Sequence, residues 1–114
     1  MALATDTMKT ALLNAYKAQG SYLSLHTGSP GSTGANESTG GSPAYSRQQT
    51  TWGTPSAGTL TGSQVSIPVP ASTITAAGVW TAATGGTFLD ALAVTSTTVS
   101  GNATIQVTPS ITIS

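Results

Sequence analysis

Apolar residues recur every three to four positions near the start of this chain and every two positions along most of the rest. Over residues 5–19 the spacing predicts one amphipathic helix, with Thr5 or Asp6 as its cap and Gly20 at its end. We expect its apolar stripe to pack across one face or end of a sheet; docking on a partner protein is the alternative. The stripe comprises Met8, Ala11, Leu12, Ala15 and Tyr16, with Lys9 and Lys17 opposite.

About seven short strands are predicted after the helix, from alternating residues and the turn signals between them. Pro68 and Pro70 should end the third strand, because proline cannot donate to a sheet ladder. No helical pattern alternates with the strands, which argues against a parallel α/β sheet. The predicted fold is mainly β, an antiparallel β-sandwich with one N-terminal helix, forming a single domain over residues 1–114. The expected strands cover residues 22–26, 48–52, 59–67, 72–80 and 87–94, a strand pair or one bent strand within 97–108, and 111–113.

A long polar loop, residues 27–43, interrupts the strands early in the chain. It is built from Gly, Ser, Thr, Pro, Ala and Asn, with Glu37 as its single charge. Loops of this length inside a domain are usually functional or disordered. Ordering one costs about 1–2 kcal/mol of backbone entropy per residue. Because its few apolar residues can offset little of that, we expect the loop to gain order by lying on a neighbouring surface.

Charged side chains are rare, and three basic and three acidic residues cancel. Three scattered basic residues cannot form the patch that a nucleic-acid binder needs. No apolar run approaches the roughly 20 residues that span a bilayer, and no signal peptide is apparent. The absence of cysteine excludes disulfides and thiolate metal sites. Near-zero net charge favours association, and plentiful Val, Ile and Thr argue against disorder, so we predict a homo-oligomer-forming β protein.

Catalytic and metal-binding patterns are not recognisable in this sequence. One histidine and three distant carboxylates are too few for zinc, and a calcium site using loop oxygens with Glu37 or Asp90 lacks a DxDxDG string. His26 could act as a base for a serine nucleophile, but no G-x-S-x-G elbow and no orienting carboxylate accompany it. We expect His26 to bond a nearby loop backbone instead. The prediction is therefore no enzyme activity and no cofactor.

Two stretches resemble a family of small bacteriophage virion proteins, often labelled tail or tail-fibre proteins. The first, LSLHTGSPGSTGANESTGGSPAYSRQ, follows the motif L-H-T-x-x-P-G-x-T-G-A-N-E and then G-G-x-Y-x-R. Ser29 stands where the family often has Asp, and Pro43 and Ala44 are inserted before the tyrosine. The second, GVWTAATGGTFLDALAV, resembles the family's G-x-W-x-A-x-x-G-G-T-F-L hairpin, in which we expect Trp80 and Phe88 to carry the core.

The resemblance implies a non-enzymatic virion structural protein, made in the bacterial host cytoplasm and assembled on the exterior of the capsid or tail. Its partners would be other virion proteins, either the major capsid protein or a tail protein. We expect a capsid decoration (cement) protein, because the short chain lacks a coiled coil, a collagen-like repeat or a fibrous shaft. The alternative is a small tail or tail-fibre component.

Receptor or carbohydrate binding through exposed aromatic side chains is a further alternative, with core packing of the same rings opposed to it. The candidates for such binding are Trp52, Trp80, Tyr22 and Tyr45. A charge-assisted bond between Glu37 and Arg47 should pin the long loop. The residues that we expect at an interface with another virion protein or subunit are Asn36, Glu37, Tyr45, Arg47 and His26.

Overall fold

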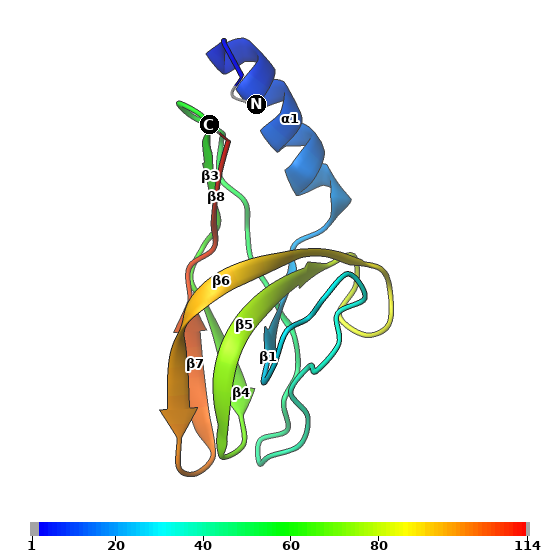
Figure 1. Ribbon diagram of the computed structural model, residues 1–114, viewed down its shortest axis with the longest axis vertical. Coiled ribbons are helices and arrows are strands. Elements are labelled where there is room, and N and C mark those ends of the chain that lie inside the picture. The colour runs from blue at the N-terminus through cyan, green and yellow to red at the C-terminus, as the bar shows by residue number, and fades with distance from the viewer. Residues whose placement is uncertain (1–2, 114) are drawn as a thin grey trace.

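The computed structural model describes residues 3–113, and within them one helix precedes eight strands. One sheet has four strands in the order β2-β1-β5-β6, and two smaller sheets pair β3 with β8 and β4 with β7 (Figure 1). Every pairing is antiparallel, so the predicted mainly β fold with one N-terminal helix is confirmed. The elements are α1 (Asp6–Gln19), β1 (Tyr22–His26), β2 (Gln48–Gln49), β3 (Thr59–Thr61), β4 (Val65–Val69), β5 (Ser72–Trp80), β6 (Phe88–Val99), β7 (Ala103–Val107) and β8 (Ser110–Thr112).

The main hydrophobic core joins the four-stranded sheet to the β4–β7 pair. Its buried residues alternate along β4, as expected for a strand with one face inward. Burying an aliphatic side chain fully stabilises the fold by about 1.5–3 kcal/mol, so this cluster holds the two layers together. The buried members are Leu23, Leu25, Val65, Ile67, Val69, Ile74, Ala77 and Val79.

The prediction of one continuous strand over residues 59–67 was wrong. This stretch consists of β3 and β4, which belong to different sheets. The chain switches sheets at Gly62, whose N–H donates to the carbonyl of Pro109 and where a side chain would overlap Thr50. Pro68 was expected to end the strand but lies inside β4, opposite Thr104. Within the described residues β4 pairs with β7 alone, and an edge strand tolerates proline.

Two other strands differ in length from their predicted ranges. The strand expected over residues 48–52 is limited to β2, and Trp52 forms only an isolated bridge with Gly62. β6 extends through residue 99 rather than ending at 94, since it follows β5 along nearly its full length. Short polar runs such as Thr95–Thr98 give no periodic signal, so pairing with a longer neighbour decides their conformation.

The helix has the predicted bounds but presents a different face to the rest of the chain. Thr5 caps it by accepting a hydrogen bond from the N–H of Met8. Leu13 is fully buried, whereas Met8 and Leu12 of the predicted stripe are 53% and 46% exposed. The helix stands at the same end of the elongated molecule as β3 and β8 (Figure 1). Lys9 and Lys17 were predicted on the outer face of the helix but are half-buried on its inner side. They can lie there because the long alkyl stems of lysines cover apolar surface.

Tyr16 is the stripe residue that does contact the sheet. Its hydroxyl donates to Asp90 at 2.8 Å, and its ring packs edge-on against Trp52. Lys17 donates to the carbonyl of Gly53 at 3.1 Å. At 14 residues, α1 is too short to cross a membrane, and no longer apolar helix occurs among residues 3–113.

Candidate functional site

The loop of residues 27–43 pairs with the end of β1 through a bridge between His26 and Glu37, and it places Gly34 and Ala35 over the face of β1 that carries Ser24 and His26. The N–H of Thr27 donates to Asn36 O and the N–H of Ser38 donates to Leu25 O, each at 2.9 Å. Inside the loop, the N–H groups of Gly34 and Ala35 both donate to the carbonyl of Pro30. The structure therefore orders this loop through contacts within its own chain. Additional contact with a neighbouring subunit stays a prediction.

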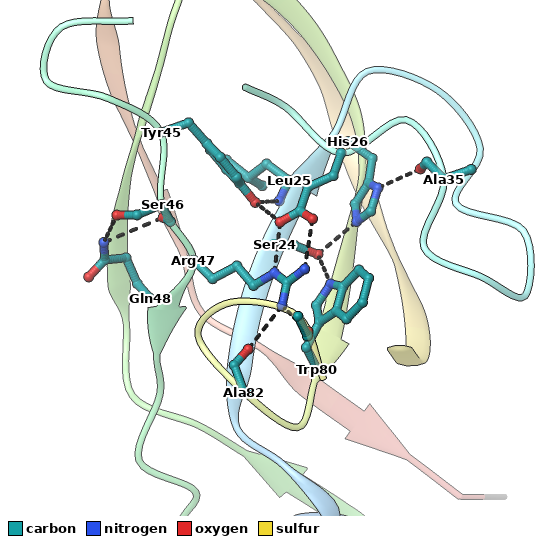
Figure 2. Close-up of polar contacts among 12 residues, drawn as sticks. Ser24, Leu25, His26, Ala35, Tyr45, Ser46, Arg47, Gln48, Trp80 and Ala82 are labelled. Carbon is teal, nitrogen blue, oxygen red and sulfur yellow. Dashed lines mark hydrogen bonds and ion pairs between the residues drawn. The ribbon is translucent and has the colours of Figure 1, made fainter. Parts of the chain in front are cut away.

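A buried chain of hydrogen bonds fixes the underside of the loop (Figure 2). Trp80 Nε1 donates to Ser24 Oγ at 2.9 Å, and Ser24 Oγ lies 2.7 Å from His26 Nε2. His26 Nδ1 lies 2.8 Å from the carbonyl oxygen of Ala35. A carbonyl only accepts, so Nδ1 carries the proton and Nε2 accepts from the serine hydroxyl. The prediction that His26 bonds a loop backbone is confirmed.

The pairing of Ser24 with His26 does not create a nucleophile that a substrate can reach. Both residues are 0% exposed, and the ring nitrogen that a carboxylate would orient contacts a backbone carbonyl. Ser24 was not singled out as a site residue from the sequence. The signal was present, because the two-residue period places Ser24 and His26 on the same face of β1.

Above this chain lies a polar cluster that we call the loop clamp, formed by Glu37, Tyr45 and Arg47. Arg47 binds the carboxylate of Glu37 with two nearly parallel bonds, Nε to Oε2 at 2.8 Å and Nη2 to Oε1 at 2.9 Å. The hydroxyl of Tyr45 donates to Glu37 Oε2 at 2.7 Å and accepts from the N–H of Leu25 at 3.1 Å. The predicted pinning of the loop by Glu37 and Arg47 is confirmed.

Arg47 also fastens the turn between β5 and β6. Its Nη1 donates to the carbonyls of Ala82 and Gly85 at 3.0 and 2.8 Å, and its Cζ lies 3.6 Å from the centre of the Trp80 ring. A guanidinium has five N–H donors in a planar fork and stacks on aromatic faces, so one side chain can hold three segments together. No sequence signal predicts the Ala82 and Gly85 contacts, because backbone carbonyls carry no residue-specific signature.

The clamp shifts the pKa values of Glu37 and Tyr45. Burial alone would raise the pKa of Glu37, but the hydrogen bonds from Arg47 and Tyr45 outweigh it and lower that pKa. Burial, together with the bond to Glu37, raises the pKa of Tyr45. At neutral pH the clamp therefore holds an ionised carboxylate between a cation and a neutral phenol.

Acid should destabilise the fold in two steps. Burial lowers the pKa of His26 from its ordinary 6.5, so the unfolded chain binds that proton more readily and stability falls as the pH drops below about 6.5. The lowered pKa of Glu37 adds a second loss below about pH 4.5. Urea unfolding across this pH range measures both steps. His26→Gln should remove the first step and keep the second; a wild-type profile that is flat between neutral pH and pH 5 would contradict the assignment.

Gly34 makes the close approach between the loop and Trp80 possible. Its φ is +78°, and a Cβ at this position would overlap the indole ring. Gly31 in the same loop has a φ of +59° and open space around its Cα. Both glycines therefore avoid the cost of the left-handed conformation, about 1–2 kcal/mol for other residues, but only Gly34 is also required by packing.

Gly34→Ala should lower the free energy of unfolding by about 1–3 kcal/mol more than Gly31→Ala does, because only the first substitution overpacks a filled site. Gly31→Ala is the matched control, since it pays the same backbone strain without the overlap. Chemical denaturation of both variants measures the difference. Equal losses would show that the ring of Trp80 moves aside without resistance.

Asn36 is the remaining candidate residue, and it lies outside the clamp. It is exposed, and its side chain donates to the carbonyl of Ser29 within the loop. A surface depression of about 310 Å³ lies beside the clamp and includes Ser38 and residues 83–85 in its lining. Each nitrogen of the Arg47 guanidinium already donates a hydrogen bond within the chain. Among residues 3–113, no three His, Asp or Glu side chains gather as a metal site would require.

The aromatic side chains proposed for ligand binding mostly serve internal packing. Trp80 is 8% exposed, and Tyr45 belongs to the clamp. Trp52 is half-buried and donates through Nε1 to the carbonyl of Gly20 at 2.9 Å. Of the four candidates, this leaves Tyr22, which is half-buried in β1. The rings do not form an open platform on which a sugar could stack.

The fold and its clamp define a β-rich module whose polar groups brace its own loops. Residues 3–113 match the sequence model of a family of phage fibre proteins, so the chain belongs to a class of phage structural proteins. The family is the one described as Podophage GP4 fiber I protein gp80, and this chain is a member of it. Among curated proteins, none matches the sequence. The resemblance to tail-fibre-type virion proteins is thus confirmed, whereas the match does not support the expected capsid decoration role and favours the tail-fibre alternative.

Proposed function

We propose that this chain is a non-enzymatic structural component of a podophage tail fibre. The observation that carries the proposal is the family match over residues 3–113, nearly the whole sequence. The internal use of the clamp side chains supports it, because groups that satisfy one another inside the fold stiffen it and leave few free for chemistry. The protein acts as a rigid part that other virion proteins bind.

The proposed partners are other tail proteins and further copies of this chain. The outer side of the long loop, which includes the exposed Asn36, is the proposed contact with a neighbouring virion protein. Glu37, Tyr45, Arg47 and His26 support that surface from beneath. Receptor binding is not part of the proposal, because three of the four candidate aromatic side chains, Trp52, Trp80 and Tyr45, make contacts within the chain.

Labelling the protein on purified phage particles tests this function. An antibody against the chain, visualised by electron microscopy, should mark the tail. The control is an antibody against the major capsid protein, which should mark the shell. Even labelling of the shell by the first antibody would overturn the proposal and restore capsid decoration.

A further inference from the structure

β6 and β7 present two open strand edges that face the same side of the molecule. They leave the turn at residues 100–102 side by side (Figure 1). Nevertheless, within residues 3–113 β6 pairs only with β5 and β7 only with β4. Natural proteins protect long edges with lysine, proline, charge or bulges. Residues Ala91–Val99 of β6 include no lysine, proline or charged side chain. β6 does contain an irregularity, the register shift opposite Ile74–Ala76, but on both sides of this shift the strand pairs with β5 and has no second neighbour among the described residues.

A groove lined by apolar and uncharged polar side chains lies between these two edges. It consists of two cavities of about 310 and 430 Å³ that share Val94, Val107 and Thr108 in their linings. Half-buried apolar side chains form much of its floor. Open edges beside a groove with apolar side chains in its floor are an arrangement to which an added β-strand binds, with backbone bonds for affinity and pockets for alternate side chains.

The chemistry of the groove selects its occupant. None of its lining residues is ionisable, and the sequence from Ala91 to its end contains no Asp, Glu, Lys, Arg or His. In a typical soluble protein about a quarter of all residues are charged. The surface of such a protein would place charges against this groove without counter-charges. This chain is 5% charged, so its own surface fits without that cost.

Hydroxyl side chains make the same surface complementary to itself. Serine and threonine both donate and accept, so two identical arrays can bond to each other. The chain already uses such a pair, since Thr73 and Thr98 bond across β5 and β6 at 2.9 Å. Cross-strand threonine pairs are among those that stabilise sheets.

We propose that the β6 and β7 edges and the groove between them are a self-association surface, occupied by the same surface of a second copy of this chain. The pairing extends the sheets across the contact and buries the half-exposed apolar residues of the groove. This inference deepens the homo-oligomer part of the proposed function and does not depend on where in the virion the protein lies.

Two matched threonine substitutions test the surface in the purified full-length chain. Thr108 is exposed and lines both parts of the groove, whereas Thr75 is also exposed but lies outside the lining, on β5, which is paired on both sides. In sedimentation velocity experiments over a concentration series, the wild-type chain should associate. Thr108→Lys should raise the dissociation constant at least about tenfold, since it places a charge in an uncharged contact, and Thr75→Lys should change it less than about twofold.

Thr97→Lys, on β6 and also in the groove lining, gives the same test if Thr108→Lys does not fold. Hydrogen exchange supplies a second measurement, in which protection of β6 and β7 amides should rise with wild-type concentration. A chain that stays monomeric at its highest soluble concentration would overturn the inference, as would equal effects of the groove and Thr75 substitutions. Protection that rises only around Met8 and Leu12 would assign the contact to α1 instead. The particle labelling described above is unaffected by any of these outcomes, so the two proposals fail separately.

Discussion

Trp80→Ala should lower the free energy of unfolding by about 3–5 kcal/mol, the range for removing a large buried aromatic side chain. Trp80 is 8% exposed, and its ring meets Phe88 edge-on with centroids 5.2 Å apart. The other sides of the ring contact Gly34 and the guanidinium of Arg47. Its loss would therefore leave a cavity beneath the loop and remove a stacking partner of the clamp. Urea denaturation followed by circular dichroism measures the change.

Trp80→Phe is the informative control for this prediction. Phenylalanine keeps most of the apolar contact but cannot donate to Ser24, so the loss should be mainly that of one buried hydrogen bond, about 1–3 kcal/mol with Ser24 left short of a donor. A near-zero effect of Trp80→Ala would mean that the ring is exposed in solution. That result would also revive receptor binding as a role for the aromatic side chains.

Arg47→Ala should destabilise the fold by about 3 kcal/mol, the low end of the range for breaking a buried ion pair. The low end applies because the side chain of Glu37 retains 20% exposure, whereas that of Arg47 is only 8% exposed. Removal strands the Glu37 carboxylate with one donor and frees the carbonyls of Ala82 and Gly85. Equilibrium unfolding in urea is the measurement.

Lys17→Ala is the matched control for Arg47→Ala. Lys17 also donates to a backbone carbonyl, but it does so at an exposed site, so its loss should cost less than about 1 kcal/mol. Arg47→Lys should recover little, because an ammonium cannot reproduce the paired bonds to Glu37 and the carbonyl bonds together. A double-mutant cycle with Glu37→Gln isolates the pair itself. A loss from Arg47→Ala as small as that from Lys17→Ala would show that water replaces the clamp.

The two stretches that resemble phage virion proteins form one structural unit here. The first supplies the loop, with Gly34 and Glu37, and Arg47, while the second supplies Trp80 and the turn that Arg47 holds. Each stretch therefore depends on the other for its conformation. This dependence offsets part of the entropy cost of ordering a long polar loop and explains how it is ordered with few apolar residues of its own.

Local signals in the sequence were sufficient for much of the secondary structure. The helix bounds follow from apolar spacing, the Thr5 cap and Gly20, all of which act within one or two turns. The strands β1 and β5 have the predicted bounds, because alternation over five and nine residues directly reports a pleated strand. The bond from His26 to the loop and the pairing of Glu37 with Arg47 were also predicted, since few alternative partners exist in so uncharged a chain.

Tertiary contacts decided the features that local spacing does not determine. The apolar stripe of α1 was predicted inward, yet of its members Met8 and Leu12 are exposed, whereas Tyr16 contacts the sheet. The place where the helix meets the sheet depends on Asp90 and Trp52, far along the sequence. The division of residues 59–69 between two sheets depends on β7 and β8 as partners. Arg47 donates to the backbone carbonyl of Ala82, which lies 35 residues away in the sequence. Every residue has such a carbonyl, so residue type does not predict this contact. Residue type and spacing therefore determined the elements and the polar pair, and long-range packing determined which surfaces they bury and which edges remain open.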